Sequence, residues 1–509
     1  MVRVIDFFCG AGGFSEGFRQ MGCDIVMGID NWKPAIETYN FNFGLNNQVK
    51  DVLDYENSIN AINELPESEI IIGSPPCVSF SNSNKSGKAD KSLGLRLTET
   101  FLRIIAVKKF QKKSSLKAWY MENVKNTIKY LKDSYSFSDL GLEEWAIQND
   151  LDPKSIALTI SDNNMIANSL NYGNPQNRKR LIVGEIIKLN KFIQPKITHC
   201  NLELDQTEFK KIILLKDIKR KLPKPSSKKS NSIISDPLYP KIKIAKSSLT
   251  DHFYDSGLYS VQWRHSKYMK RNHPFMGKMS FPENEENPSR TITATNIGTS
   301  RESIIYRSEF NREGDGEYRT PTVREMASLM GFPMTYQFFG KSEHSKLRLV
   351  GNAVSPSLSK ALATITISKV KLKTKKIRVT NKITLPNNFV NLNNYKQKVF
   401  NNPPRKNKDA KFRMHPFKYG NITVTLSNYD ITKKSASYRW RTSVQYGNGK
   451  GTQMDNYRDQ YFKRIENVIL EFENGDKFLE VINNGFSERI PGSRTVSYTH
   501  LTLPTILLV

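Results

Sequence analysis

The stretch VRVIDFFCGAGG, residues 2–13, decides the fold of this 509-residue chain. Its first half is a short apolar run, the pattern of a buried strand in a parallel sheet. Its second half is a glycine-rich turn, and the residues after it predict a helix that ends near Gly22. A strand, a glycine-rich turn and a helix in this order predict the opening of an α/β domain.

The same alternation continues along the chain. Helical patterns at 33–44 and 95–110 lie between further short apolar runs. The predicted strands are CDIVMGID at 23–30, IIIGSPPC at 70–77, KAWYMENV at 117–124 and RLIVGEII at 180–187. Strands that alternate with helices predict a Rossmann-like, doubly wound, mostly parallel sheet. Periodic structure then resumes at 290–370, where Thr320 and Pro321 suit the start of one helix and Ser355 and Pro356 the start of another.

Composition narrows the class of protein. A hydrophobic fraction of 38% with 25% charged residues is typical of a globular chain, and its length suggests roughly two to four domains. The N-terminus has no secretory signal pattern, and no apolar run reaches the length of a membrane span. The four cysteines have no paired spacing, so we expect neither a zinc ribbon nor a disulfide framework, and a reducing cytoplasm fits.

Positive charge is concentrated in two segments. The chain carries 77 Lys and Arg against 49 Asp and Glu, a formal charge of +28. Residues 186–289 hold about +10 and residues 371–494 about +15, so the remainder is nearly neutral. Coding bias toward lysine is the alternative explanation, but bias would spread the charge evenly. A neutral body with basic attachments favours a catalytic fold that binds a polyanion, most often nucleic acid.

Polar groups follow the predicted strands where cofactors bind in such folds. Gly10, Gly12 and Gly13 allow a tight turn and close approach of a ligand, although the third spaced glycine of the dinucleotide fingerprint is missing. Asp30 lies 18 residues after Gly12, at the end of the second strand, where a carboxylate can hold the hydroxyls of a ribose. The sequence therefore favours a cofactor that contains a nucleoside.

Two further strand ends carry reactive groups. Cys77 follows Pro75 and Pro76, so it stands on a stiff turn beside a Ser- and Gly-rich segment, as a presented nucleophile would. A lone cysteine is more often a buried packing residue. Glu122 ends another apolar run, and by itself it is equally a cap or a functional acid.

Six motifs in order resemble the DNA cytosine-5 methyltransferase family over about residues 1–365. They are DFFCGAGGFSEGF, GSPPCVSFS, MENV, QNRKR at 176–180, RTITATN at 290–296 and GNAVSP at 351–356. The resemblance implies a class I fold that uses S-adenosyl-L-methionine and acts on double-stranded DNA, from which the target cytosine is flipped out. It also implies no metal, and we expect a monomer of bacterial or phage origin.

The resemblance assigns roles to individual residues. Cys77 would be the nucleophile, Glu122 would bind the cytosine ring, and Arg178 and Arg180 would hold the cytosine carbonyl and the glutamate. The cofactor pocket would comprise Phe8, Gly10, Gly12, Gly13, Asp30, Asn31, Asp51, Pro75 and Asn352. Asn31 departs from the pattern, because many relatives carry a bulky apolar residue there. Cys9 also departs from it, and we expect a buried, inert thiol at that position.

The resemblance also divides the chain. Residues 1–185 would be the first part of the catalytic domain, 186–289 the target recognition domain, and 290–370 the end of that domain and the return to the catalytic fold. Residues 371–494 would be a basic accessory region with strand-like alternation at 421–430. Residues 495–509, which begin TVSYTHLTLPT, resemble a translated sequencing-library adapter and are left out of the fold prediction.

Three functions stay open on the sequence. The first is a DNA methyltransferase, which a restriction-modification system would pair with a separately encoded endonuclease. The second is an RNA methyltransferase of the branch that modifies transfer RNA, although the long basic segment 186–289 favours DNA. The third is an inactive DNA-binding relative, against which the intact Cys77 and Glu122 argue.

Overall fold

The computed structural model divides into two compact units, Met1–Lys398 and Val399–Val509. The structure describes residues 2–76, 91–201, 208–227, 230–272, 277–294, 298–375 and 380–394, the four strands of the second unit, and residues 467, 470, 471, 475 and 476. Cys77, most of the segment after it and residues 495–509 lie outside the described residues.

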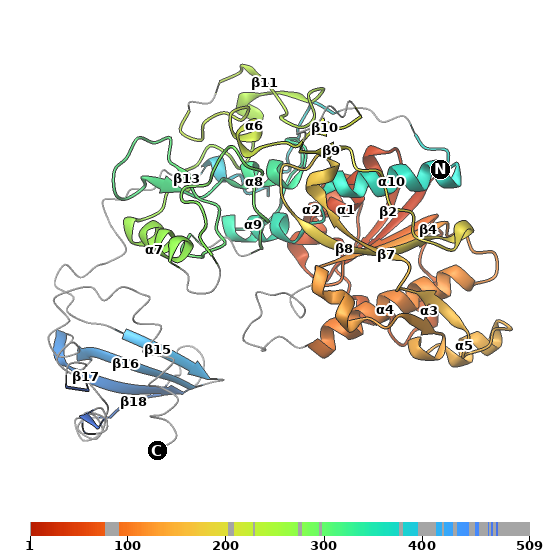
Figure 1. The fold of residues 1–509 in the computed structure, drawn as a ribbon, viewed down its shortest axis with the longest axis horizontal. Coiled ribbons are helices and arrows are strands. Elements are labelled where there is room, and N and C mark those ends of the chain that lie inside the picture. Colours follow the sequence, from red (N-terminus) through yellow and green to blue (C-terminus); the bar gives the residue numbers. More distant parts are fainter. Residues whose placement is uncertain are drawn as a thin grey trace. The chain divides into compact units, whose positions relative to one another are not determined.

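The centre of the first unit is a six-stranded sheet in the order β2-β1-β3-β4-β8-β7 (Figure 1). The first four strands are parallel to one another. Strand β8 is antiparallel to both of its neighbours, β4 and β7. The strands are β1 (Arg3–Phe7), β2 (Asp24–Ile29), β3 (Ile70–Gly73), β4 (Ala118–Asn123), β7 (Asn164–Asn168) and β8 (Lys179–Ile186). The predicted doubly wound, mostly parallel sheet is confirmed.

Helices cover both faces of this sheet (Figure 1). On one face α1 (Gly13–Gln20) and α10 (Pro356–Val370) pack together, so the last helix of the catalytic fold lies against the first. On the other face α4 (Lys91–Phe110) supplies Phe101, whose ring contacts Phe7 and Trp119. Strands β1, β3, β4 and β8 bury both faces, because adjacent residues enter separate hydrophobic clusters. The remaining helices of this half are α2 (Lys33–Phe43), α3 (Ile59–Asn63) and α5 (Glu143–Gln148). Helix α5 lies in the connection between β5 (Ser134–Ser136) and β6 (Ile156–Thr159), which pair in a small antiparallel sheet.

Residues 186–289, which we call the recognition segment after the role predicted for them, have little regular structure. It contains α6 (Leu215–Lys219), α7 (Ser260–Arg271) and strand pairs β9 (His199–Cys200) with β10 (Lys210–Lys211) and β11 (Ile233–Ser235) with β12 (Lys243–Ala245). The chain returns through β13 (Tyr306–Arg307), β14 (Tyr318–Arg319), α8 (Val323–Met330) and α9 (Glu343–Asn352).

Helix α8 begins later than predicted. The expected cap was Thr320 with Pro321 at the first helical position, but Thr322 caps the helix by accepting a hydrogen bond from the backbone N–H of Glu325. The Glu325 carboxylate in turn accepts from the N–H of Thr322. This reciprocal capping box places the helix start at Thr322. Ser355 and Pro356 begin α10 as predicted.

The first unit continues past residue 370, where the sequence placed a boundary. Lys375 donates its N–H to the carbonyl of Gly22, which returns the chain to the turn between α1 and β2. Further along, Leu392 is buried in the cluster that holds α8 and α9. Residues 380–394, which we call the strap, are therefore part of the catalytic unit.

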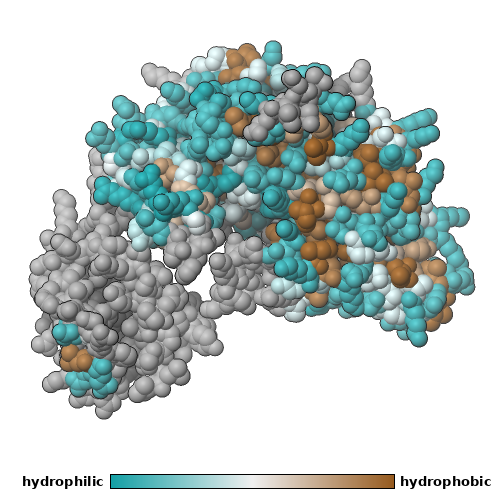
Figure 2. Space-filling model, in the orientation of Figure 1, coloured by the Kyte–Doolittle hydropathy of each residue, from teal (hydrophilic) through white to brown (hydrophobic). Residues whose placement is uncertain are grey.

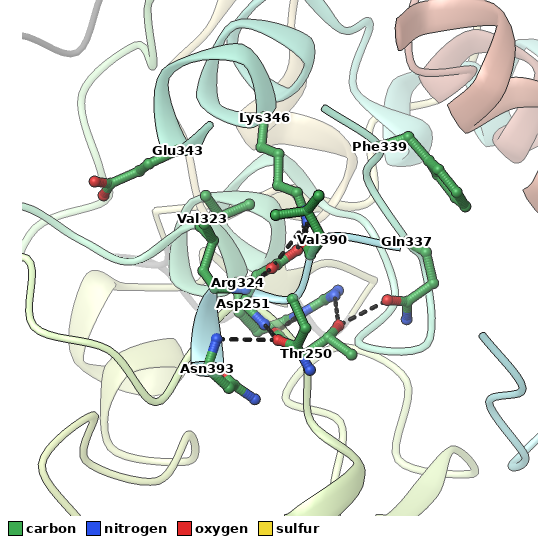
Figure 3. A network of polar contacts seen from close by, with 12 residues as sticks. Thr250, Asp251, Val323, Arg324, Gln337, Phe339, Glu343, Lys346, Val390 and Asn393 are labelled. Carbon is green, nitrogen blue, oxygen red and sulfur yellow. Dashed lines mark hydrogen bonds and ion pairs between the residues drawn. The ribbon is translucent and has the colours of Figure 1, made fainter. Parts of the chain in front are cut away.

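The strap ends in a buried polar network (Figure 3). The ammonium of Lys346 on α9 pairs with Asp251 of the recognition segment at 2.7 Å, and both side chains are fully buried. The same ammonium donates to the carbonyl of Val390, and the N–H of Leu392 donates to Asp251. Asn393 accepts the N–H groups of residues 252 and 253. The strap thus joins the recognition segment to α9.

The second unit contains an antiparallel sheet in the order β15-β16-β17-β18. Its strands are β15 (Met414–Tyr419), β16 (Ile422–Asp430), β17 (Ser435–Tyr446) and β18 (Gln453–Tyr457). The strand predicted from the alternation at 421–430 is confirmed as β16. Within the described part of the chain, no helix is long and apolar enough to cross a membrane.

Candidate functional site

The candidate site lies at the carboxyl ends of the parallel strands. Strand β2 pairs with one side of β1, and β3 pairs with the other. The connection from β1 leads to β2 on one side, and the connection from β3 leads to β4 on the other, which opens a crevice between β1 and β3 at this edge of the sheet. The glycine turn follows β1, Asp30 follows β2, Pro75 follows β3, and Glu122 stands at the end of β4. The described residues that were predicted at strand ends thus lie at one edge of the sheet, whereas Cys77 is outside the described residues.

The turn after β1 has an unusual backbone. Phe8, Gly10 and Gly12 all have positive φ, at 55°, 52° and 79°. The hydroxyl of Ser74, after β3, donates to the carbonyl of Phe8 at 3.1 Å and helps to hold this conformation. A Cβ added to Gly10 would meet only the carbonyl oxygen of Phe8, at 3.9 Å. The backbone at Gly10 therefore lines open space, as a turn that receives a ligand must.

The GNAVSP motif meets this turn from far along the chain. A Cβ on Gly13 would lie 2.1 Å from the carbonyl oxygen of Val354, so only glycine fits there. Gly351 also packs tightly, against residues 293 and 294, because an added Cβ would lie 2.4 Å from the carbonyl oxygen of Thr293. Asn352, the last residue of α9, is exposed directly beside these contacts. Asn352 therefore lies two residues before Val354, whose carbonyl packs against the glycine turn.

Asp30 is held on both of its oxygens. One oxygen accepts the N–H of Gly10 at 2.9 Å, and the other accepts the N–H of Trp32 at 2.8 Å. Burial raises the pKa of Asp30, while these two N–H groups and the positive charge of Arg348 oppose that rise. Each carboxylate oxygen keeps a further lone pair, so Asp30 can still accept hydrogen bonds from a ligand.

Asn31 and Asp51 lie together beside Asp30. The amide of Asn31 donates to one oxygen of Asp51 at 3.0 Å. The other oxygen of Asp51 accepts the N–H of Leu53 and so caps the short helix Val52–Tyr55. The two residues predicted for the cofactor pocket are therefore hydrogen-bonded to each other, and an amide occupies the position where many relatives carry an apolar side chain.

Glu122 and Arg180 form a buried ion pair. The guanidinium of Arg180 lies 3.0 Å from the carboxylate of Glu122, which is only 6% exposed. Burial raises the pKa of Glu122, and the charges of Arg180 and Arg178 oppose this rise. A carboxyl group with a raised pKa can hold or donate a proton closer to neutral pH than an ordinary glutamate can.

Arg178 has different contacts from Arg180. Its guanidinium is buried and donates to the backbone carbonyls of Ile292, Gly351 and Ala353, at 3.0 to 3.2 Å. These carbonyls belong to the RTITATN and GNAVSP motifs. The described contacts of Arg178 therefore tie two distant motifs together.

Two positioning residues lie outside the predicted set. Asn123, the residue after Glu122, donates its amide to the carbonyl of Pro75 at 3.2 Å and so links β4 to the turn that leads to Cys77. Arg348 lies over the ring of Trp32, 4.6 Å from its centre. Arg348 stands four residues before Asn352 on the same helix, a spacing that could have revealed it.

The prediction of a buried, inert thiol at Cys9 is confirmed. The thiol is buried, and burial raises its pKa well above the ordinary value, which keeps it protonated and unreactive.

Comparison with known proteins identifies the family. The family model described as C-5 cytosine-specific DNA methylase matches residues 2–368. The chain belongs to this family. Two type II methyltransferases are each 29% identical to it over 71% of this chain: M.HgiDI of Herpetosiphon aurantiacus, of which 93% is covered, and M.MthTI of Methanothermobacter thermautotrophicus, of which 95% is covered. M.HgiGI of Herpetosiphon aurantiacus is 42% identical over 105 residues, which are 20% of this chain and 80% of its own.

Proposed function

We propose that this cytosine-5 methyltransferase transfers a methyl group from S-adenosyl-L-methionine to carbon 5 of a flipped-out cytosine in a specific duplex DNA sequence. The observation that carries the proposal is the buried Glu122–Arg180 pair, 3.0 Å apart at the end of β4. Asn123, next to Glu122, holds the Pro75 turn that precedes Cys77. In this proposal an acid and a nucleophile would act from neighbouring strand ends of one crevice.

The crevice fits S-adenosyl-L-methionine on this chain's own residues. The glycine turn around Gly10 lines open space, and Asp30 beside it keeps lone pairs for the ribose hydroxyls. Asp51 would accept from the adenine amino group, while Phe8, Asn31, Pro75 and Asn352 would complete the pocket. When bound, the cofactor supplies an electrophilic methyl group on a sulfonium.

The chain's residues would carry the cytosine through addition and elimination. The Cys77 thiolate attacks carbon 6, and the electron pair of the ring double bond becomes available at carbon 5. Glu122 donates a hydrogen bond or its proton to ring nitrogen 3, which neutralises the charge that the attack builds up. Carbon 5 takes the methyl group, a base removes the proton from carbon 5, and the bond from Cys77 to carbon 6 breaks.

Arg178 and Arg180 would have different roles in this proposal. Arg180 would orient the Glu122 carboxyl, because their ion pair is direct. Arg178 would act mainly by fixing the RTITATN and GNAVSP segments, since its described contacts are with their backbone carbonyls. Contact of Arg178 with the cytosine carbonyl stays a prediction from the resemblance.

Recognition of the target DNA sequence would depend on residues 186–289. The chemical step needs only a flipped cytosine, so the neighbouring bases must be read by contacts in the DNA grooves. We further propose a type II restriction-modification system in a bacterial or phage-infected cytoplasm, with a separately encoded endonuclease. The type II methyltransferases among the relatives support this setting.

Bisulfite sequencing tests the proposed function. DNA from a bacterial host that expresses the chain should carry protected cytosines at one recurrent sequence, and DNA from a host that expresses the Cys77→Ala variant should carry none. Unmodified cytosines throughout, from a folded protein supplied with cofactor, would exclude DNA methylation. Methylated transfer RNA from the same cells would favour the RNA alternative.

Replacing Glu122 with glutamine should slow methyl transfer by roughly 10²- to 10⁴-fold. The amide keeps the size and one hydrogen-bond donor of the acid, but it cannot give a proton to ring nitrogen 3. Single-turnover transfer of a tritiated methyl group to DNA measures the effect, and binding of S-adenosylhomocysteine should stay unchanged. Equal transfer rates in the two proteins would show that Glu122 is not the acid.

The outward face of α7 is the best candidate for DNA contact within the recognition segment. Arg264, Lys267, Tyr268 and Arg271 follow the i, i+3, i+4, i+7 spacing of one helix face, and three of them are exposed. The opposite face is buried through Trp263, which belongs to a small hydrophobic cluster with Phe281. Among the described residues no carboxylate pairs with these cations, whereas the buried Lys270 pairs with Glu283. Figure 2 shows a mainly hydrophilic surface in this part of the molecule.

Removing the cations of this face should weaken DNA binding. The double variant Arg264→Ala, Arg271→Ala should lower the slope of log affinity against log salt concentration by about 2 if both groups contact phosphates. Fluorescence anisotropy over a salt series measures the slope. Lys154→Ala, at an exposed position of the catalytic half, is the control. An unchanged slope together with relaxed choice at one base would identify a base contact instead.

A further inference from the structure

Arg348 stands over the edge of the predicted cofactor pocket although no motif includes it. It is an exposed residue of α9, one helical turn before Asn352. Its guanidinium carbon lies 4.6 Å from the centre of the Trp32 ring. A guanidinium stacked on an aromatic face is attracted by the ring and loses freedom. The stack therefore holds a positive charge at a fixed place.

That place is next to Asp30. The N–H of Trp32, the residue beneath Arg348, donates to Asp30 at 2.8 Å. The stacked guanidinium is also near enough to favour the ionised form of this carboxylate. Trp32 thus contacts Asp30 through its backbone and Arg348 through its ring. One residue connects the charge on α9 to the carboxylate at the end of β2.

Asp30 needs such a charge because its other surroundings oppose ionisation. It lies mostly buried, and the carboxylate of Asp51 repels its negative form. Asp6 and the thiol of Cys9 are also close, but both are buried with raised pKa values, Asp6 at about 8, so they are neutral or nearly so at neutral pH. Among the described ionisable groups that act on Asp30, Arg348 provides the positive charge.

We propose that Arg348 is a positioning residue of the cofactor site, which acts through Asp30 by keeping that carboxylate ionised and able to accept the ribose hydroxyls. This inference rests on the proposed use of S-adenosyl-L-methionine. Trp32 holds the guanidinium in place, and α9 carries it together with Asn352. In this proposal α9 contributes a pocket residue, Asn352, and also the positive charge of Arg348 that keeps Asp30 ionised.

The sign of the pH effect follows from this role. Asp30 must be ionised to bind the ribose, so cofactor affinity falls as pH drops through its pKa. Without the charge of Arg348 the pKa of Asp30 rises further, and affinity is lost at a higher pH. Because Arg348 is exposed and salt screens its charge, we expect the displacement of the acid limb to be larger at low ionic strength.

Calorimetric titration of the full chain with S-adenosylhomocysteine between pH 5 and 8 tests the proposal. In Arg348→Met, which keeps an apolar chain over Trp32, the acid limb of the affinity profile should move to higher pH, with little change near pH 8. Arg348→Lys keeps the charge and should stay closer to the unaltered profile. Lys360→Met removes an exposed charge from α10 and should leave the profile unmoved.

Two results would overturn the proposal. An unmoved acid limb in Arg348→Met would show that the charge does not act on Asp30. A loss of affinity by the same factor at every pH would show direct contact with the cofactor or a purely structural role. If the unaltered protein itself does not bind S-adenosylhomocysteine, the proposed cofactor fails instead, and that result is distinguishable from both.

Discussion

Replacing Cys77 with alanine should abolish methyl transfer while leaving S-adenosylhomocysteine binding largely intact. The sulfur supplies the bond to carbon 6 without which carbon 5 does not become nucleophilic, so no residual pathway of comparable rate exists. Most of the groups predicted to hold the cofactor, among them Gly10 and Asp30, lie on other strand ends. Methyl transfer from a radiolabelled cofactor and calorimetric binding measure the two properties separately.

A mechanism-based substrate makes this test direct. DNA that carries 5-fluorocytosine should trap the unaltered protein as a covalent adduct, because after methylation the fluorine cannot leave as a proton does. The Cys77→Ala variant should form no adduct that survives denaturing electrophoresis. Cys9→Ala is the matched control, since its thiol is buried and protonated, and this variant should still be trapped. An adduct on the Cys77 variant would identify another nucleophile.

Much of the site could be predicted because its positions follow from local patterns. Asp30 and Glu122 each end an apolar run, and the ends of parallel strands necessarily meet at one edge of a sheet. The glycine turn could be predicted for the same reason, since Gly10 and Gly12 have the positive φ that glycine permits.

Contacts between distant segments could not be read in this way. Arg178 and Arg180 stand two residues apart in one motif, yet Arg180 pairs with a carboxylate and Arg178 donates to carbonyls more than a hundred residues further along the chain. Only the three-dimensional packing of the two motifs separates these roles. The same holds for Arg348, whose importance depends on the distance from α9 to Trp32.

The predicted start of α8 was wrong for a different reason. Thr320 and Thr322 are chemically equivalent caps, and Pro321 favoured the earlier one. The glutamate three residues after Thr322 decides between them, because it completes the capping box. That signal was present in the sequence, whereas the strap at 380–394 has no helical or strand pattern and is fixed by buried contacts alone.

Two truncations should separate the catalytic unit from the basic C-terminal region. A chain that ends at Lys398 keeps the whole first unit and should remain folded and active. A chain that ends at Val370 loses the strap, which exposes the cluster around Leu392 and removes the carbonyl of Val390 from Lys346. The Lys346–Asp251 pair would then lose buried hydrogen-bond partners, at a cost of about 1–3 kcal/mol for each unsatisfied group.

The loss on ending at Val370 should be a large fraction of the total stability. Removing a buried leucine side chain alone costs about 2–5 kcal/mol, while small domains are stable by only about 5–15 kcal/mol. We therefore expect the 1–370 chain to be insoluble or to unfold well below the 1–398 chain in a thermal melt. Leu392→Ala in the full chain is the graded control and should lower the melting temperature without preventing folding.

Equal stability and activity of the two truncated chains would contradict this role of the strap.

If the 1–398 chain is folded and active, comparing it with the full chain also measures the contribution of the second unit to DNA binding. Residues 399–494 carry positive charge, so their removal should weaken DNA binding and flatten its salt dependence if that unit contacts phosphates. The site of methylation should not move, because the recognition segment and the strap that joins it to α9 are both retained. A changed site would place sequence recognition in the second unit instead.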